Sequence, residues 1–420
     1  MKIYLDTVGC RLNQAEIETM AMQFRAAGHE VVASADVADM AVVNTCAVTA
    51  NAVSDSRGKI RAIARAGVNE IVATGCWTTL QPQRARELPH VTHVITNDRK
   101  ENLTAEVLDL PTFELEPLNR VPLPGLHRRT RAFIKVQDGC DNHCTFCVTT
   151  VARGESRSHT IADVIRDIQS ALNGGTKEIV LTGVHLGSWG QDFGLHLSEL
   201  ICAILHETDI QRLRLSSLEP WDLDAGFFAL WTDSRLMPHL HLPLQSGCAS
   251  TLKRMARKTM PDSFRELVAA ARRVMPDAAI TTDVIAGFPG ETESEFAESL
   301  AFVKEMNFAG GHVFTYSPRL GTGAARMKEQ IRPEVRKERN HILRDVLEES
   351  AKIYRHKFIG DTMSVLWEST SEVGESGWQM EGLTGNYLRV KAVAPSPRWN
   401  VIDEVKLTEL TSDGLRAEML

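Results

Sequence analysis

The sequence lacks any apolar run near the ~20 residues that a bilayer-spanning helix needs. It also lacks the basic start and apolar core of a secretory signal, because its first ten residues, MKIYLDTVGC, have the pattern of a buried strand. These absences argue against a membrane helix and against secretion. We therefore expect a cytoplasmic protein with no membrane partner.

An excess of positive charge is also missing. The chain has 47 Lys and Arg against 54 Asp and Glu, a formal net charge of −7. Overall charge therefore does not favour nucleic-acid binding, and any such surface must be local. With 43% hydrophobic and 24% charged residues, the composition is that of a globular protein, and 420 residues allow two or three domains.

Cysteine is the first unusual feature that is present. The eight cysteines stand at positions 10, 46, 76, 140, 144, 147, 202 and 248. A reducing cytosol makes disulfides a poor explanation, so metal or redox roles come first. Cys202 occupies an apolar position of the helical run LSELICAILHE and is expected in the core. Cys248 lies in the loop QSGCAS and is expected to be structural.

Residues 1–97 alternate strand and helix patterns. The runs KIYLDTV, HEVVAS, MAVVNT, EIVATG and HVIT are rich in β-branched residues, and helical stretches lie near 13–27, 50–66 and 78–87. This alternation predicts a doubly wound parallel sheet, an α/β architecture.

Three of the predicted strands end in a cysteine: Cys10, Cys46 and Cys76. The carboxyl ends of parallel strands share one sheet edge, so we expect these thiols to lie together. Burial as small hydrophobes is one alternative. A structural zinc site is another, but such sites usually take ligands from paired C-x2-4-C hooks, and these cysteines are singletons. An iron–sulfur cluster with three thiolates and one open iron fits better.

Residues 98–125 have the pattern of a linker, because Pro111, Pro117, Pro122 and Pro124 would break a helix. Residues 126–354 return to alternation, with six strand candidates: AFIKVQ, EIVLTG, RLRLSS, HLHLPL, ITTDVIAG and HVFTY. Successive strand–helix units predict a partial or full parallel βα barrel, whose chemistry belongs on the loops after the strands.

The loop after the first of these strands contains CDNHCTFC, in which Cys140, Cys144 and Cys147 form C-x3-C-x2-C. Zinc would need a fourth ligand, and His143 is awkwardly placed beside Cys144. The spacing and place of this motif resemble the radical S-adenosylmethionine (SAM) superfamily. The resemblance implies a 4Fe-4S cluster whose open iron chelates SAM.

Later loops of the predicted barrel agree with this resemblance. In that superfamily an aromatic residue lies against the adenine, a glycine-containing motif lies near the methionine amino group, and polar groups hold the ribose and carboxylate. A glycine-rich fifth-strand motif lies beside the adenine. The cofactor-binding residues implied here are Phe146, Thr182, Gly183, Ser217, Glu219, Gln245, Asp283 and Gly287.

Residues 355–420 contain short alternating strands separated by turn glycines, which predicts a small β-barrel. The segment resembles the TRAM domain, an RNA-binding module, although its seven Lys and Arg against ten Asp and Glu make it acidic. Local basic stretches lie elsewhere. Arg254, Arg257 and Lys258 follow the fourth barrel strand and are candidates for holding phosphates; the alternative is a solvated helix face.

Taken together, the whole chain resembles the methylthiotransferases, which combine an N-terminal cluster domain, a radical SAM core and a TRAM domain. The motifs TVGCRLNQAEIE, VVNTCAVT, ATGC, CDNHCTFC and DVIAGFPGETE support this. The segments GVHLGS and LTGNYLRV are similar to the enzymes that act on N6-threonylcarbamoyladenosine in tRNA. VTTV after Cys147 departs from the usual Ile/Val-Pro pair. The candidate substrate-binding residues are Asn13, Gln14, His185, Arg254, Arg257 and Lys258.

The resemblance implies two 4Fe-4S clusters and two uses of SAM. One SAM methylates a sulfur carried on the N-terminal cluster; a second yields a radical that removes hydrogen from C2 of the adenine, where the methylthio group adds. Ordinary acid–base groups cannot attack such a C–H bond, so the chemistry is assigned to the two clusters and SAM, and the catalytic side chains are left open. The implied partners are tRNA, an electron donor and a sulfur source, while the oligomeric state is left open. Alternatives are the isopentenyladenosine branch, the ribosomal-protein branch and a non-enzymatic iron–sulfur carrier.

Overall fold

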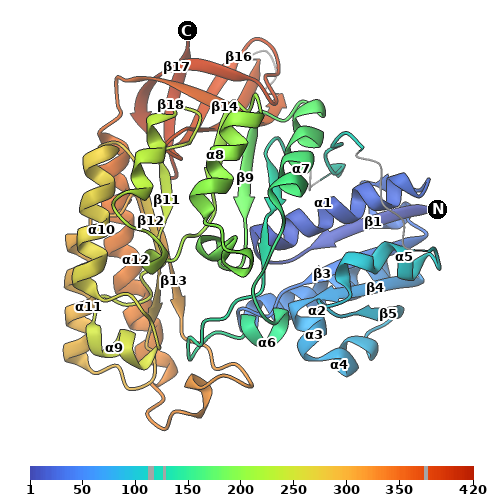
Figure 1. Ribbon diagram of the computed structural model, residues 1–420, viewed down its shortest axis with the longest axis horizontal. Coiled ribbons are helices and arrows are strands. Elements are labelled where there is room, and N and C mark those ends of the chain that lie inside the picture. Colours follow the sequence, from blue (N-terminus) through green and yellow to red (C-terminus); the bar gives the residue numbers. More distant parts are fainter. Residues whose placement is uncertain (112–117, 126–128, 373–376) are drawn as a thin grey trace.

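The computed structural model describes residues 1–111, 118–125, 129–372 and 377–420. Figure 1 shows an N-terminal sheet beside a central half-barrel, with a small β-barrel at the end of the central part. The division at residues 97, 125 and 354 stays a prediction. Pro117 of the predicted linker and residue 126, the predicted start of the central part, lie outside the described residues.

The N-terminal part is a parallel five-stranded sheet of order β2-β1-β3-β4-β5, as predicted. Helices cover both faces. α1 and α5 pack on one apolar cluster, and α2, α3 and α4 on the other. The strands are β1 (Lys2–Thr7), β2 (Glu30–Val32), β3 (Met40–Thr45), β4 (Glu70–Gly75) and β5 (Val91–Ile95). The helices are α1 (Arg11–Ala26), α2 (Ala50–Arg65), α3 (Cys76–Leu80), α4 (Pro82–Arg86) and α5 (Leu103–Val107).

Two predicted elements of this part differ in detail. The helix expected over 78–87 is split into α3 and α4, because Pro82 cannot donate the backbone hydrogen bond that a continuous helix needs. Residues 98–111, placed in the linker, contain α5, which packs against α1. Lys100 in this stretch is 4% exposed.

The central part contains six parallel strands, all six of those predicted, in two sheets of order β6-β9-β10 and β11-β12-β13. Bridges from Leu213 to Leu236 and from Ser217 to His241 join the two sheets. No pairing within the described residues joins β6 to β13, so the barrel is partial. The strands are β6 (Ala132–Lys135), β9 (Glu178–Thr182), β10 (Arg212–Leu215), β11 (His239–His241), β12 (Ala279–Ala286) and β13 (Gly310–Thr315).

Five of the described helices cover the outside of this half-barrel and bury a large apolar cluster against its strands. They are α7 (Ile161–Asn173), α8 (Leu197–Glu207), α10 (Pro261–Val274), α11 (Glu293–Glu305) and α12 (Pro333–His356). Two short helices pack elsewhere: α6 (Thr149–Arg153) adds Ala152 to the apolar cluster around α3, and α9 (Ala249–Arg254) adds Leu252 to a separate cluster with Phe288. Between β10 and β11 the connection has only short 3-10 turns, at Pro220–Asp222 and Phe227–Thr232. A short antiparallel pair, β7 (Gln137–Asp138) and β8 (Arg157–Ser158), follows β6.

The expectation that Cys202 is a core residue is wrong. The buried face of α8 consists of Leu197, Leu200, Ile201 and Ile204, which follow helical spacing. Position 202 falls on the other side of the helix, and its thiol is exposed. Cys248 is fully buried, as expected of a structural residue.

The C-terminal part is a closed five-stranded barrel of order β14-β15-β16-β18-β17, which confirms the predicted small β-barrel. Its strands are β14 (Thr362–Glu372), β15 (Trp378–Thr384), β16 (Arg389–Ala394), β17 (Ile402–Leu410) and β18 (Leu415–Met419). Arg212, the first residue of β10, donates to the carbonyl of Leu383 at 3.0 Å, so the barrel sits at the amino-terminal end of the central strands.

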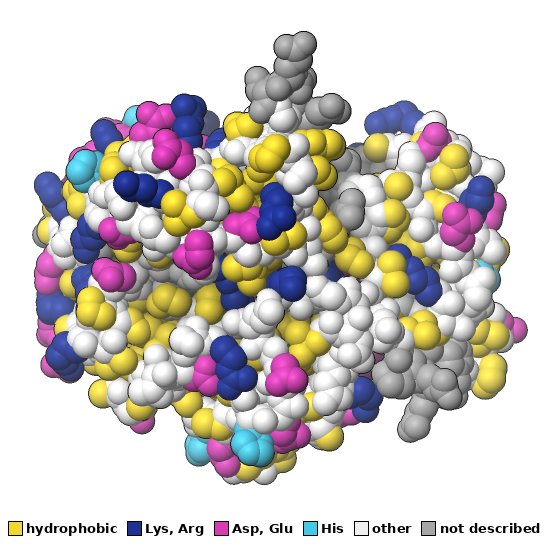
Figure 2. Space-filling view, turned by 90° about the horizontal axis from the view of Figure 1, so that it is seen from above, with side chains coloured by type: hydrophobic (Ala, Val, Ile, Leu, Met, Phe, Trp, Pro, Cys, Tyr) yellow, Lys and Arg dark blue, Asp and Glu magenta, His cyan; other side chains and the backbone are white. Residues whose placement is uncertain are grey.

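The surface on the side of the C-terminal barrel carries mixed charge. In Figure 2, which views the molecule from this side, Lys and Arg are interspersed with Asp and Glu over the described surface. Arg389 and Lys391 both pair with Asp413. None of the described helices is long and apolar enough to span a bilayer.

Candidate active site

The three cysteines at the strand ends line a single cavity of about 1050 Å³. Cys10 follows β1 as the N-cap residue of α1, Cys46 follows β3, and Cys76 opens α3 directly after β4. The thiols of Cys46 and Cys76 are buried, that of Cys10 is exposed, and all three are free. Burial raises the pKa of Cys46 to about 11.

Two glycines allow this close approach. Gly9 has φ +106°, and a Cβ placed there would lie 2.7 Å from Sγ of Cys46. Gly75 has φ +98°, and its Cβ would lie 2.4 Å from the carbonyl oxygen of Thr45. Only glycine satisfies both the backbone conformation and the space at these positions. The glycine that precedes Cys10 and the one that precedes Cys76 are therefore part of the site.

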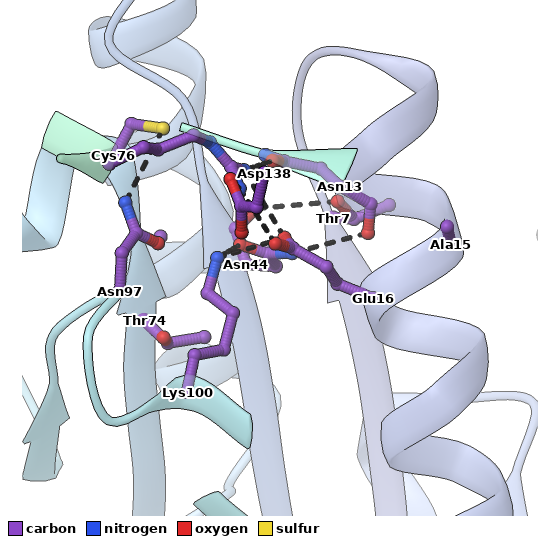
Figure 3. A network of polar contacts seen from close by, with 12 residues as sticks. Thr7, Asn13, Ala15, Glu16, Asn44, Thr74, Cys76, Asn97, Lys100 and Asp138 are labelled. Atoms are coloured by element: carbon purple, nitrogen blue, oxygen red, sulfur yellow. Dashed lines mark hydrogen bonds and ion pairs between the residues drawn. The ribbon is translucent and has the colours of Figure 1, made fainter. Parts of the chain in front are cut away.

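A buried network of charges lies beneath these thiols. Nη1 of Arg153 donates to Glu16 Oε1 at 2.8 Å and to Asp138 Oδ1 at 2.9 Å. Nζ of Lys100 lies 2.8 Å from Glu16 Oε2. Burial works to raise the pKa of Glu16, but Arg153 and Lys100 hold it well below its usual range. Figure 3 shows Glu16, Asp138 and Lys100 converging from different segments.

This network also contacts the thiols and connects the two parts of the chain. Nδ2 of Asn97 lies 3.7 Å from Sγ of Cys76, and the Cys10 thiol lies 3.7 Å from Oδ1 of Asn13. Glu16 belongs to α1, which begins directly after Cys10. Arg153 ends α6, which begins two residues after Cys147. One set of ion pairs therefore connects α1 and α6, the helices that follow Cys10 and Cys147.

Asn13 lines the cavity, so the substrate contact expected of it stays a prediction, and it also has a structural role. It is 1% exposed, it donates to the carbonyls of Val8 and Thr45, and its Oδ1 accepts from Arg153. These bonds use its amide and fix the loop around Cys10. Gln14 is half-buried on α1, and the described lining of the cavity does not include it.

The second group of cysteines lies on the loop after β6, and each thiol has a polar neighbour. Nδ2 of Asn142 donates to Sγ of Cys140 at 3.5 Å, and the backbone N–H of Thr149 donates to Sγ of Cys147 at 3.4 Å. Nη1 of Arg257 lies 3.9 Å from Sγ of Cys144. Burial raises the pKa of Cys144 to about 11.

His185 lies next to Cys140 and is held by Asp222. Its Nε2 stands 2.5 Å from Oδ2 of Asp222, and its Nδ1 3.2 Å from Nδ2 of Asn142. Burial works to lower the pKa of His185, but the bonds to Asp222 and Cys140 outweigh it and raise the pKa to about 9. The bond to Asp222 therefore fixes the imidazole directly beside a candidate cluster ligand.

Arg257 is not part of a surface patch, and this corrects the expectation from its basic neighbourhood. Its side chain is 2% exposed, pairs with Glu219 at 2.6 Å and covers the ring of Trp221 at 4.3 Å. A buried guanidinium cannot reach a phosphate outside, and its pairing also occupies the Glu219 carboxylate. Arg254 pairs with Glu295 at 2.7 Å, while Lys258 is exposed.

Five of the eight implied SAM-binding residues line the same cavity as the N-terminal cysteines: Thr182, Gly183, Ser217, Gln245 and Asp283. The other three do not appear in its described lining. Phe146 packs edge-on against Phe288 with ring centroids 6.5 Å apart, and Gly287 lies against Arg336. A SAM role for these residues stays a prediction.

Several lining residues were not singled out from the sequence. His241 and His312 flank Asp283 at 3.4 and 3.6 Å. Burial works to raise the pKa of Asp283, but its bonds to the two histidines hold it below the usual range. Arg11 and Tyr387 also line the cavity. The alternation in HLHLPL, which places residues 239 and 241 on one strand face, was the available signal for His241.

The donor sets fit clusters better than single ions. Within the described residues, no three His, Cys, Asp or Glu side chains are placed to share one metal ion. A zinc ion would need its ligands gathered at bonding distance, whereas a 4Fe-4S cluster binds its thiolates on different irons. All six cysteines at the strand ends and on the β6 loop are free, which matches the chemistry of iron–sulfur ligands.

Comparison with known proteins agrees with both halves of this site. Residues 2–96 match the model of the uncharacterized protein family UPF0004, and residues 134–303 match that of the radical SAM superfamily. In fold, the chain resembles the radical SAM methyltransferase TsrM from Kitasatospora setae, with a TM-score of 0.56, 14% identity and 77% of each chain covered. The fold and the cysteine loop define a radical SAM enzyme.

Similar sequences identify the family. The threonylcarbamoyladenosine tRNA methylthiotransferase MtaB of Bacillus subtilis is 36% identical, over 91% of this chain and 88% of its own length. MtaB of Thermotoga maritima is 35% identical over 100% and 98%. A tRNA-2-methylthio-N(6)-dimethylallyladenosine synthase of Bacillus cereus is 31% identical over 100% and 86%. The chain belongs to the radical SAM methylthiotransferases.

Proposed function

We propose that this enzyme adds a methylthio group to C2 of N6-threonylcarbamoyladenosine beside the anticodon of tRNA. The supporting observation is that the three strand-end cysteines and five of the implied SAM-binding residues surround one cavity. A reaction that joins a sulfur-bearing centre to a radical-generating centre needs both within reach of one substrate atom. A loop base can be splayed out of its stack to enter such a cavity.

The radical SAM fold implies one 4Fe-4S cluster, held by Cys140, Cys144 and Cys147, and SAM as its partner. We place a second cluster on Cys10, Cys46 and Cys76. When bound, these groups supply one-electron chemistry and the methylthio group. The protein's own residues bury and orient the cysteine ligands. Arg257 places a positive charge beside Cys144, and the bonds of His185 favour the thiolate of Cys140.

The choice of threonylcarbamoyladenosine is supported by two segments. GVHLGS begins at Gly183, which lines the cavity, and contains His185, which bonds to Asp222. LTGNYLRV contains the turn between β15 and β16, where Asn386, Tyr387 and Leu388 line the cavity. The segments that resemble the threonylcarbamoyl branch thus lie at the place where a substrate would bind.

Isopentenyladenosine in tRNA is the second candidate, because the synthase relative at 31% identity aligns with the whole chain. A non-enzymatic iron–sulfur carrier is excluded, since the chain belongs to an enzyme family. The sequence relatives reported above are all named as enzymes that act on tRNA, and this favours tRNA over a ribosomal protein as the substrate. An electron donor and a sulfur source complete the proposed set of partners.

Nucleoside analysis of tRNA from a strain that lacks this gene tests the substrate. We expect loss of the 2-methylthio derivative of threonylcarbamoyladenosine, accumulation of its unmethylthiolated form, and recovery on complementation. Methylthiolated isopentenyladenosine should be unchanged. Loss of the isopentenyl derivative instead would assign the enzyme to the other tRNA branch.

A further inference from the structure

Tyr387 reaches from the C-terminal barrel into the cavity between the two other parts. It lies in the turn between β15 and β16 with φ +66°, a left-handed conformation that is unfavourable for a residue other than glycine. Its ring stacks on His239 with centroids 4.2 Å apart and an interplanar angle of 14°. A tyrosine held in this conformation and fixed by stacking indicates a constrained position.

Three guanidinium groups surround this ring, and they differ in how their charge is balanced. Arg131 pairs with Glu368 at 2.5 Å, and Arg214 pairs with Glu178 at 2.8 Å. Nη2 of Arg11 donates to the hydroxyl of Tyr387 at 2.8 Å. No carboxylate among the described residues forms an ion pair with Arg11. Arg11 therefore brings an uncompensated positive charge to the cavity wall, one residue after Cys10.

The acidic side chains that line the cavity already have cationic partners. Asp283 lies between His241 and His312. Glu348 accepts from Arg355 at 2.8 Å, and Asp413 from Lys391 at 3.0 Å. None of these carboxylates neutralises Arg11. The guanidinium is fixed by a hydroxyl, faces the cavity, and has its remaining N–H donors available for an anion.

We propose that Arg11, oriented by the Tyr387 hydroxyl, binds the carboxylate of the threonine moiety on the substrate adenosine. This inference rests on the proposed function and names the residue that selects its substrate. A guanidinium pairs with a carboxylate through two parallel hydrogen bonds. An apolar isopentenyl group at the same place would cover the Arg11 charge without supplying an anion, so the same residue favours one nucleoside and rejects the other.

SAM also has a carboxylate, so the experiment must separate two sources of the same chemistry. The holoenzyme is assayed anaerobically with two anticodon stem-loop RNAs, one with N6-threonylcarbamoyladenosine and one with its methyl ester. The measured quantity is the ratio of kcat/KM for the acid to that for the ester. The KM for SAM is determined on both RNAs.

For the wild-type enzyme we expect the acid to be preferred by ~10- to 100-fold, the effect of one charge-assisted pair. Arg11→Gln should bring this ratio close to one. Tyr387→Phe removes only the hydroxyl that orients Arg11, so it should reduce the ratio mainly through the KM for the acid. Arg355→Gln is the matched control, because its guanidinium lines the same cavity but is already paired with Glu348; it should keep the wild-type ratio.

The iron content of each variant shows whether it has folded. If Arg11→Gln loses iron, the acid-to-ester ratio of Tyr387→Phe is used to test the inference instead. A wild-type enzyme that uses acid and ester equally overturns the inference. An unchanged ratio in Arg11→Gln does so too, and a raised KM for SAM on both RNAs would assign Arg11 to the methionine carboxylate. A wild-type enzyme active only on an isopentenyladenosine RNA would overturn the proposed function itself, before any variant is tested.

Discussion

At the scale of single residues, Arg153 joins the two halves of the site through buried ion pairs. Its guanidinium is 2% exposed and bonds Glu16, Asp138 and Asn13, which belong to both halves of the site. A buried ion pair adds little compared with an apolar replacement of both partners, but removal of one partner leaves a buried charge uncompensated. Arg153 therefore keeps α6 and α1 in register.

Arg153→Leu should lower the free energy of unfolding by about 3–5 kcal/mol, because the carboxylates of Glu16 and Asp138 lose a buried partner. Urea denaturation measures this. Arg166→Leu is the control, since Arg166 pairs with Asp163 on the surface with 54% of its side chain exposed, and should cost at most about 1 kcal/mol. An equal loss of unfolding free energy in the two variants would show that the buried network does not join the two parts.

Asp167 gives a prediction for pH. Burial raises the pKa of this half-buried carboxyl to about 6. The folded state then binds more protons than the unfolded state between about pH 4 and 6, so stability falls as pH rises through this window. Asp167→Asn should remove that fall and add ~1–2 kcal/mol at pH 7, with no gain below about pH 4.

The measurement is urea denaturation of wild type and variant across this pH range. Asp163→Asn on the same helix is the control. A hydrogen bond from Thr160 lowers the pKa of Asp163, so its removal should reduce stability at neutral pH. Identical pH slopes for wild type and Asp167→Asn between pH 4 and 6 would contradict the burial of Asp167.

At the scale of elements, the ends of β1, β3 and β4 determine the N-terminal site. Gly9→Ala should displace Cys46, because a Cβ at position 9 would meet its Sγ at 2.7 Å. Iron analysis after anaerobic reconstitution should show about four of about eight irons lost. Gly28→Ala is matched, since Gly28 also has positive φ but nothing within 4 Å; it should keep all its iron. Equal iron contents would place the second cluster elsewhere.

The elements themselves were largely predictable from the sequence. β-branched runs predicted all five strands of the first sheet and all six of the half-barrel, because buried parallel strands are continuous apolar segments. The strand-end cysteines followed from sheet geometry. The position of Cys202 was not predicted, because an apolar neighbourhood was given more weight than the helical spacing of Leu197, Leu200, Ile201 and Ile204.

At the scale of the whole molecule, the sequence could not show which side chains meet across the three parts. Arg11 and Tyr387 are 376 positions apart and touch through one hydrogen bond. Arg257 belongs to a basic stretch, yet the fold buries it against Glu219 and Trp221. A dense basic stretch in the sequence indicates a charged surface only when its side chains are known to be exposed. Periodicity and spacing predict elements, while long-range pairing decides the role of each cation.

The central claim is that the two cysteine groups perform separate tasks in one reaction. It is tested most directly by one anaerobic assay on tRNA, in which 5′-deoxyadenosine and the methylthiolated nucleoside are measured together. The variant Cys10→Ala/Cys46→Ala/Cys76→Ala should form 5′-deoxyadenosine but no methylthiolated nucleoside. The variant Cys140→Ala/Cys144→Ala/Cys147→Ala should form neither. Methylthiolation by the first variant would contradict the claim, because the strand-end cysteines would then be only structural.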